Sequence, residues 1–290
     1  SWMDKLLFLP FLNLLARPLD RLGRFLSIPS WRWSEVQTNR LHVALWGLAF
    51  FILLPSFNAH PGRTVAFWEP RCEHGVDRAC ENIAILLQSA CEKDDAAACY
   101  FLGLRFEHGD AVPIDLARAG GAYQRACELE QGDGCRALGV LFTHGKGVEK
   151  NPQAAVGLFS RGCDYGSAES CVFAAEALAR DLVEGGQQRA PAFARKACDK
   201  KQARGCFLYG QALRTGRGVT RSLSAAVTAY RSGCDQADPN SCTMLGTMTW
   251  MGDGTPADPI AARVILETAC KTSAKACQQL ERLRLGAPTP

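Results

Sequence analysis

The chain has 290 residues, enough for one large or two small domains, and 47% of them are hydrophobic, so a substantial core is possible. The 33 lysine and arginine residues nearly balance 29 aspartate and glutamate residues, which leaves a formal net charge of +4. This balance gives no support for nucleic-acid binding, which calls for a basic stripe or a much higher isoelectric point. The composition includes 14 cysteines, all of which lie between Cys72 and Cys277.

Residues 1–40 are rich in leucine, phenylalanine and tryptophan, and prolines divide them into short pieces. Arg17, Arg21 and Arg24 recur at helical spacing opposite an apolar face, and Trp31 and Trp33 follow. Basic residues, an apolar face and tryptophans are typical of an amphipathic helix that lies in the membrane interface. Packing of this helix on the protein's own core is the alternative. We therefore expect an interfacial segment over residues 1–40, on the cytoplasmic side.

Residues 41–57 form an apolar stretch, and no Asp, Glu, Lys or Arg occurs from residue 41 to residue 62. This length is at the short end of what crosses a bilayer as a helix. A cleaved signal peptide fits less well, because forty residues precede the stretch and Phe57 does not suit a cleavage site. The sequence predicts an uncleaved transmembrane helix with these anchor residues: Leu41, Trp46, Phe50, Phe51, Leu54 and Phe57.

The distribution of basic residues around this stretch predicts its orientation. Six basic residues precede it, whereas Arg63 and Arg71 are the only ones just after it. Because basic loops stay in the cytoplasm, we expect a cytoplasmic N-terminus, a linker over residues 58–71 and an exported domain over residues 72–290. The expected location is the bacterial inner membrane, with that domain in the periplasm. The mitochondrial inner membrane, with the domain in the intermembrane space, is the alternative.

The exported domain is a repeat. Its cysteines form pairs eight residues apart, except the last pair, which is seven apart, and from Cys91 onward the pairs start 35 or 36 residues apart. In most periods, glycine follows the second cysteine by four and by ten residues, and alanine precedes the next pair by eight. Apolar residues between the glycines have helical spacing. Each period therefore predicts two helices, the first ending at the second glycine and the second ending at the next cysteine.

The segments Leu138–Val148 and Ala154–Phe159 carry this pattern, as do Gly210–Val219 and Ala225–Tyr230. They resemble the Sel1-like repeat family, and the cysteine pairs make the chain similar to its disulfide-bearing, helical cysteine-rich branch. A cysteine-rich Sel1-like assembly factor of the mitochondrial intermembrane space is similar too. The resemblance covers about residues 80–285 and implies an all-α, right-handed superhelical solenoid of helix pairs, placed after the interfacial helices and the transmembrane helix.

Two parts of the repeat region depart from the family pattern. In residues 171–198, Ala174 and Ala175 replace the usual Leu-Gly, and Glu184–Gly186 replaces the Gly-x-Gly loop. The segment between Cys80 and Cys91 is too short for two helices. It is expected to be a lone helix that starts the array.

Export to an oxidising compartment and an even number of cysteines favour disulfides. The rival pairing across one helix pair, such as Cys99 to Cys127, leaves two cysteines over and requires a bridge from Cys80 to Cys91 along one helix, about 16 Å. Pairing of neighbours uses all fourteen. The predicted disulfides are Cys72–Cys80, Cys91–Cys99, Cys127–Cys135, Cys163–Cys171, Cys198–Cys206, Cys234–Cys242 and Cys270–Cys277.

Motifs for chemistry are mostly absent from the sequence. It has no Cys-x-x-Cys for redox or zinc chemistry, and no haem-attachment motif. His108 and His144 share one repeat position and are interpreted as helix-end residues rather than metal ligands or an acid–base pair. Glu176, Asp181 and Glu184 are interpreted as a solvated face. We therefore predict no catalytic residue, cofactor site or metal site.

The predicted function is that of a non-catalytic scaffold or accessory subunit of a membrane complex. Stacked helix pairs present a long concave surface, formed mainly by the first helices, that suits protein partners. The other expected contact is membrane lipid. The resemblance leaves two alternatives open, a penicillin-binding or β-lactamase-like periplasmic enzyme and an assembly factor that handles haem or another cofactor for a respiratory complex.

Overall fold

The computed structural model divides the chain into two units, residues 1–61 and 62–290. It describes residues 63–284 apart from 77, 110–111 and 181–182, all within the second unit. The interfacial segment predicted over residues 1–40 and the transmembrane helix predicted over residues 41–57 lie outside the described residues. Within the described ranges, every helix is too short or too polar to cross a membrane.

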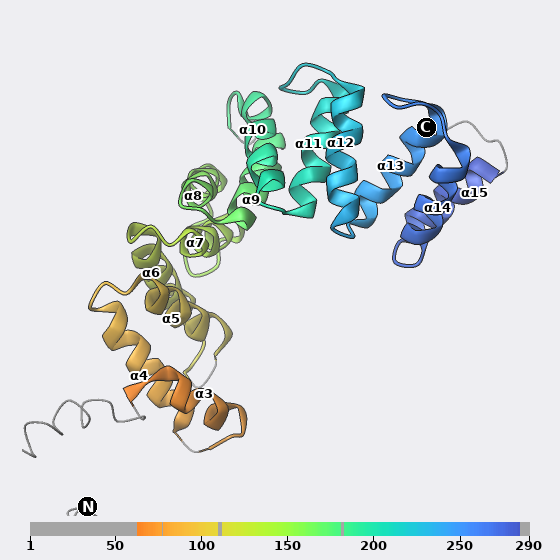
Figure 1. Ribbon diagram of the computed structural model, residues 1–290. Coiled ribbons are helices and arrows are strands. Elements are labelled where there is room, and N and C mark those ends of the chain that lie inside the picture. The colour runs from red at the N-terminus through yellow and green to blue at the C-terminus, as the bar shows by residue number, and fades with distance from the viewer. Residues whose placement is uncertain (1–62, 77, 110–111, 181–182, 285–290) are drawn as a thin grey trace, which may run out of the picture. The chain divides into compact units, whose positions relative to one another are not determined.

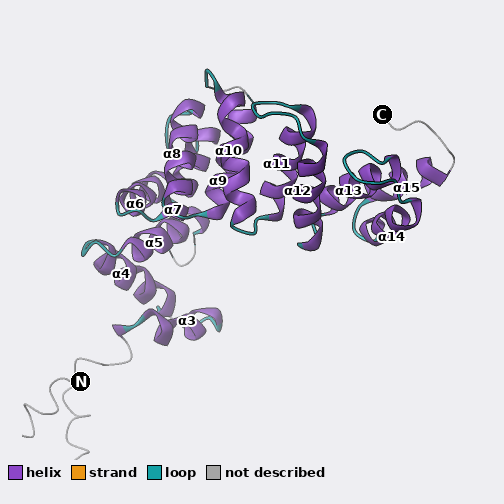
Figure 2. Ribbon diagram, turned by 45° about the horizontal axis from the view of Figure 1, so that its top comes forward, coloured by secondary structure: helices purple, strands orange, loops and turns teal. Residues whose placement is uncertain are grey.

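All regular elements among the described residues are helices (Figure 2). Two helices, α3 (Val65–Glu73) and α4 (Ala79–Cys91), start the array, and α15 (Ala274–Arg284) ends it. Five helix pairs lie between them: α5 (Ala96–His108) with α6 (Leu116–Glu128), α7 (Gly132–His144) with α8 (Pro152–Asp164), α9 (Ala168–Ala179) with α10 (Gly186–Asp199), α11 (Ala203–Thr215) with α12 (Leu223–Asp235), and α13 (Pro239–Met251) with α14 (Pro259–Cys270). The all-α fold built from helix pairs is confirmed.

Local signals set the helix ends. Four first helices end at a glycine in the left-handed conformation, which glycine adopts without a Cβ clash: Gly109, Gly145, Gly216 and Gly252. Four second helices begin at a side chain that accepts a hydrogen bond from a free backbone N–H in the first turn: Asp115, Asn151, Ser222 and Asp258. The exception is α10, which begins at Gly185 without a side-chain cap.

The helices stack in chain order, as Figure 1 shows, so each pair contacts mainly its neighbours. The buried apolar residues accordingly form several small clusters between adjacent helices instead of one central core. The largest cluster contains Tyr123, Leu138 and Leu141, which bring α6 and α7 together. A solenoid of this kind is stabilised repeat by repeat.

The array begins earlier than the sequence pattern indicates. The helix α3 covers the second half of the segment predicted as a linker, residues 58–71, and it packs against α4. It precedes the first complete period and contains Pro70, so neither the repeat nor local propensity pointed to a helix there. The segment Cys80–Cys91 is the single helix that the sequence predicts, although α3 precedes it.

Seven disulfides join α3 to α4, α4 to α5, and the end of each second helix to the start of the helix that follows it. They are the seven pairs that the spacing predicts. Their Cα atoms are 4.4 to 4.8 Å apart, so the two helices must approach closely. Small residues beside the sulfurs allow this approach. The facing residues, one before each cysteine, are Ala126 and Gly134, Gly162 and Ser170, Ala197 and Gly205, and Gly233 and Ser241.

Candidate protein-binding surface

The first helices form the closer-packed layer of the array. From α5 to α13, each first helix packs against the first helix of the next pair. Among the second helices of the described pairs, only α10 and α12 pack against each other as closely. The layer whose members lie closer together is the inner side of a curved stack. We call the exposed and half-buried side chains of the first helices the inner face.

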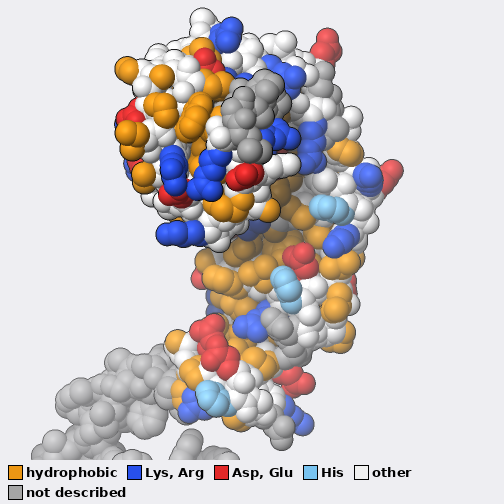
Figure 3. All heavy atoms as spheres, turned by 90° about the vertical axis from the view of Figure 1, so that its right-hand side faces the viewer, with side chains coloured by type: hydrophobic (Ala, Val, Ile, Leu, Met, Phe, Trp, Pro, Cys, Tyr) orange, Lys and Arg blue, Asp and Glu red, His pale blue; other side chains and the backbone are white. Residues whose placement is uncertain are grey.

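Apolar and aromatic side chains are frequent on the inner face. Figure 3 shows hydrophobic side chains gathered in a hollowed stretch, with charged groups beside them. Phe101 on α5 is 51% exposed, although Phe173 occupies the same position on α9 and is half-buried against Phe159, with ring centroids 5.2 Å apart. The helix before α5 is α4, and it leaves the Phe101 ring exposed.

Ion pairs connect successive first helices across the inner face. Arg136 on α7 lies 3.1 Å from the carboxylate of Glu169 on α9, and Arg204 on α11 donates to Glu176 on α9 at 2.8 Å. These side chains are partly exposed, so each pair contributes about 0–1 kcal/mol to stability. Each of them links two neighbouring first helices.

A large side chain from each regular second helix covers a glycine on its first helix. A Cβ atom added to Gly139 would lie 2.6 Å from the Phe159 ring, and one added to Gly210 would lie 2.7 Å from the Tyr230 ring. Gly103 beneath Tyr123 and Gly246 beneath Leu266 repeat the arrangement. The glycine four residues after the second cysteine therefore makes room for a ring or a leucine.

In the pair α5–α6, the side chain that covers the glycine is Tyr123, and its hydroxyl group is hydrogen-bonded. Its hydroxyl donates a hydrogen bond to Glu107 on α5 at 2.5 Å, while its ring lies 5.9 Å from that of Tyr100. Burial raises the pKa of Tyr123 well above its ordinary value, and the hydrogen bond to Glu107 raises it further. The phenol is therefore neutral and acts as a donor.

The pair α9–α10 has neither the covered glycine nor the large side chain that covers it in the other pairs. Ala175 stands where the other pairs have glycine, and Ala194 stands where they have a ring or leucine. The aromatic residue lies one position earlier, at Phe193, and packs on Ala174, where the other pairs have leucine or tyrosine. Phe193 thus faces the preceding pair, and Ala175 and Ala194 are both buried without a ring between them.

A groove lies between α9, α10 and α11, and we call it the α9–α11 groove. Its floor and walls are apolar: Ala175, Ala179, Ala190, Pro191, Ala194, Leu208 and Ala212. Its rim is polar: Gln187, Gln211, Thr215 and Arg217. The departure at Ala174 and Ala175 was visible in the sequence, but the groove also depends on Ala194, which belongs to the other helix of the pair.

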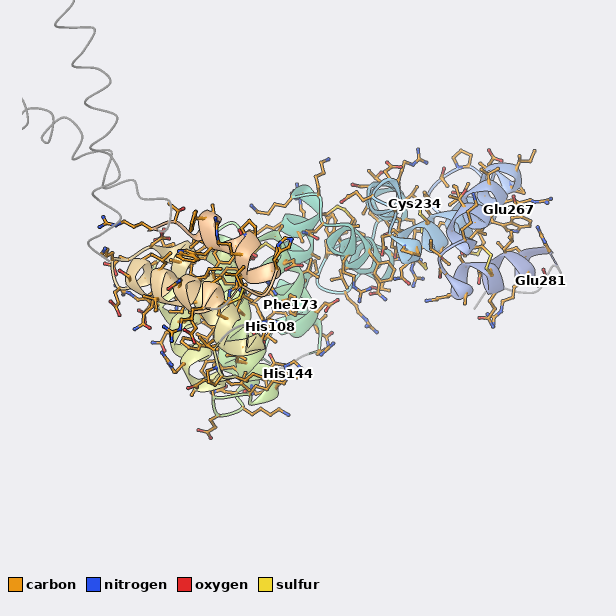
Figure 4. All side chains as sticks on the ribbon, turned by 90° about the horizontal axis from the view of Figure 1, so that it is seen from below. His108, His144, Phe173, Cys234, Glu267 and Glu281 are labelled. Carbon is orange, nitrogen blue, oxygen red and sulfur yellow. A yellow bond between two sulfur atoms is a disulfide. The ribbon has the colours of Figure 1, made fainter. Side chains whose placement is uncertain are left out.

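The histidines singled out in the sequence are helix-end residues. The ring Nδ1 atoms of His108 and His144 lie 2.9 Å from the backbone carbonyl oxygens of Leu104 and Val140, one turn earlier on the same helices. Figure 4 labels both histidines, which are exposed and lie one helix pair apart. The described residues contain no group of three or more potential metal ligands.

Two of the three carboxylates singled out in the sequence, Glu176 and Glu184, are among the described residues. Glu176 is half-buried and pairs with Arg204, so it is part of the inner face. Glu184 is exposed in the loop before α10, and Asp181 lies outside the described residues.

Four segments of the chain match the Sel1 repeat family, residues 96–130, 132–167, 203–238 and 239–271. Each contains one helix pair with the covered glycine. The segment between the second and third matches, which contains α9 and α10, does not match. Sel1 repeats are generally modules for protein–protein interaction.

Solved structures with Sel1-like folds are similar to this chain. A protective antigen of uropathogenic Escherichia coli with an SLR fold is 25% identical over 71% of this chain, with a TM-score of 0.58, and this chain spans 48% of its length. A Sel1 repeat protein from Oxalobacter formigenes is 20% identical, with a TM-score of 0.59, over 66% of this chain and 84% of its own.

Cysteine-rich protein B of Helicobacter pylori is 32% identical over 38% of this chain and 90% of its own, with a TM-score of 0.31. No curated protein matches the chain significantly. The four matched repeats, the two similar folds and the seven disulfides together identify the chain as a cysteine-rich Sel1-like helical protein.

Proposed function

We propose that the array binds a partner protein through its inner face and is a non-catalytic accessory subunit of a membrane complex. The observation that carries the proposal is the row of partly exposed apolar side chains on the first helices, with Phe101 exposed at its start. Exposed aromatic residues beside polar groups are typical of protein interfaces. Ion pairs between neighbouring first helices lie on the same face.

The membrane part of the proposal is supported by the sequence. The uncharged stretch 41–57, with its excess of basic residues upstream, suits an anchor that leaves the repeats on the exported side. Disulfides of this number are stable in an oxidising compartment such as the periplasm. The apolar and tryptophan-containing residues 1–40 would then contact lipid or neighbouring subunits.

The test uses two matched variants of the whole chain. Phe101→Glu places a charge on the inner face, and Ile260→Glu places the same charge on the second helix α14, where Ile260 is 80% exposed. Both positions are exposed, so both variants should fold. We expect Phe101→Glu to reduce copurification of partner subunits from mildly solubilised membranes at least tenfold, while Ile260→Glu leaves it unchanged.

Equal recovery from the two variants would contradict binding through the inner face. The location is tested separately, by adding protease to spheroplasts. Cleavage should remove the repeats and spare the first forty residues. The reverse pattern would overturn the proposed orientation.

A further inference from the structure

The first helix of the array, α3, contributes no buried residue to the fold. None of its nine residues is buried, whereas each of the other described helices buries at least three. It packs mainly on α4, beside which Figure 1 shows it. Its half-buried Val65, Trp68 and Cys72 pack against the apolar cluster that contains Ile83 and Leu87. The docking of α3 therefore rests on partly exposed contacts.

The disulfide Cys72–Cys80 compensates for this lack of burial. A helix as short as α3 is marginal in water by itself, and Pro70 inside it has no backbone N–H to donate. The disulfide ties the end of α3 to the start of α4 across a sequence separation of eight residues. In the chain-entropy model, closing so short a loop favours the closed arrangement about fiftyfold. We therefore expect the disulfide, more than burial, to keep α3 docked.

The first and last disulfides are the ones most accessible from solvent. Both cysteines are partly exposed in Cys72–Cys80 and in Cys270–Cys277, whereas each of the five disulfides between them has at least one buried cysteine. A thiol must reach a sulfur atom of a disulfide in order to exchange with it, so burial slows the reaction. A reductant should therefore reach the two terminal disulfides before the others.

The helices at the two ends of the described array differ in what else holds them. The last helix, α15, is also tied by a partly exposed disulfide, but it buries Ala276, Leu280 and Leu283 and packs on both α13 and α14. Opening Cys270–Cys277 would leave these buried contacts in place. Opening Cys72–Cys80 would remove the main constraint on α3.

We propose that Cys72–Cys80 is a site of thiol–disulfide exchange with a dithiol reductant, and that its reduction releases α3 from α4. A thiolate of the reductant attacks one sulfur atom and forms a mixed disulfide, and the other cysteine leaves as a thiolate. The second thiol of the reductant then displaces the first, so the reductant leaves as a disulfide and has given up two electrons. The two cysteines take up the two protons that the reductant loses. Release of α3 uncovers the part of the apolar cluster that it covers, at Ile83 and Leu87.

The test uses the full chain in mild detergent, with dithiothreitol as the reductant. Thiols that open at increasing reductant concentration are alkylated and located by peptide mapping. We expect Cys72 and Cys80, together with Cys270 and Cys277, to be alkylated before any of the other ten cysteines. Hydrogen exchange, followed by mass spectrometry, should then become about fiftyfold faster for the amides of α3 and change less than fivefold for those of α15. Reoxidation by oxidised glutathione should restore slow exchange in α3.

Two double variants separate the effect of this disulfide from that of the reductant. Cys72→Ser with Cys80→Ser should show the fast exchange of α3 without any reductant, while unchanged exchange in α7 shows that the array is still folded. Cys270→Ser with Cys277→Ser is the matched control, and it should leave α15 protected.

Three results would overturn the proposal. The first is reduction of the five inner disulfides before or together with Cys72–Cys80. The second is slow exchange of α3 in both the reduced protein and the Cys72→Ser, Cys80→Ser variant. The third is equal release of α15 in its own variant, because the loss of burial that distinguishes α3 would then have no effect.

Discussion

The regular pairs and the pair α9–α10 have the same helices and the same disulfides at their junctions, yet they fill the space inside the pair differently. In the regular pairs, a ring or leucine from the second helix covers a glycine on the first. In α9–α10, two alanines face this space, and the ring has moved to Phe193 on the other side. Every pair therefore has a disulfide at its junction with the helix that follows it, whereas the large side chain that covers a glycine inside the pair is absent from α9–α10.

The comparison also shows how much change inside a pair the stack accommodates. The backbone of α9–α10 still continues the stack, because its junctions at Cys163–Cys171 and Cys198–Cys206 have Cα separations like those of the other pairs. In this pair the ring is moved by one position, and the α9–α11 groove lies beside it. The loss of the side-chain cap at Gly185 belongs to the same departure from the pattern.

The largest expected effect comes from converting a regular pair to the irregular type. Phe159→Ala removes the ring that covers Gly139 and leaves a cavity, so the free energy of unfolding should fall by about 3–5 kcal/mol. Adding Gly139→Ala fills part of that cavity and restores helix propensity, so the double variant should be more stable than the single Phe159→Ala variant. Urea denaturation followed by circular dichroism measures both.

The single variant Gly139→Ala is the control for this pair of substitutions. Gly139→Ala alone should destabilise the protein by about 1–3 kcal/mol, because its Cβ atom would collide with the Phe159 ring. If the losses in free energy of unfolding from Gly139→Ala and Phe159→Ala add up to the loss in the double variant, the ring and the glycine do not interact. That result would contradict the contact between Gly139 and the Phe159 ring.

The disulfides should contribute equally to regular and irregular pairs. Replacing both cysteines of Cys127–Cys135 by alanine should lower the free energy of unfolding by about 2–3 kcal/mol, as expected for closing so short a loop. Replacing Cys198–Cys206 at the end of α10 should have the same effect within error. A much smaller loss at Cys198–Cys206 would mean that the irregular pair does not depend on its junction, and the comparison would fail.

The reverse conversion should stabilise the irregular pair. Ala175→Gly with Ala194→Phe buries a new ring, worth about 2 kcal/mol, against about 1 kcal/mol lost by placing glycine in a helix. A net gain of about 1 kcal/mol in urea denaturation is expected. Ala194→Phe alone is the matched control, and it should gain less or lose stability because the methyl group of Ala175 occupies the place of the ring.

The sequence predicted most of the fold because the repeat is explicit in it. The cysteine spacing, the glycine that ends each first helix and the caps of the second helices are local signals that recur each period. The helix α3 was missed because it stands outside the period and includes Pro70. The groove was missed because it depends on Ala175, Ala194 and Leu208, whose side chains meet only when three helices are packed.

The last expected effect distinguishes a regular pair by its tyrosine and depends on pH. Burial and the hydrogen bond to Glu107 raise the pKa of Tyr123 above the value of about 10 that it has in the unfolded chain. The unfolded chain therefore loses this proton first, so the stability that Tyr123 contributes is present below pH 10 and is lost as the pH rises above it. Between pH 9 and pH 11, the free energy of unfolding should fall by about 1.4 kcal/mol more in the wild-type protein than in Tyr123→Phe. Parallel urea titrations at the two pH values measure this difference, and lysine ionisation cancels because it is common to both proteins. Equal falls in both proteins would show that Tyr123 ionises as easily in the folded array as in the unfolded chain, which its burial beside Glu107 opposes.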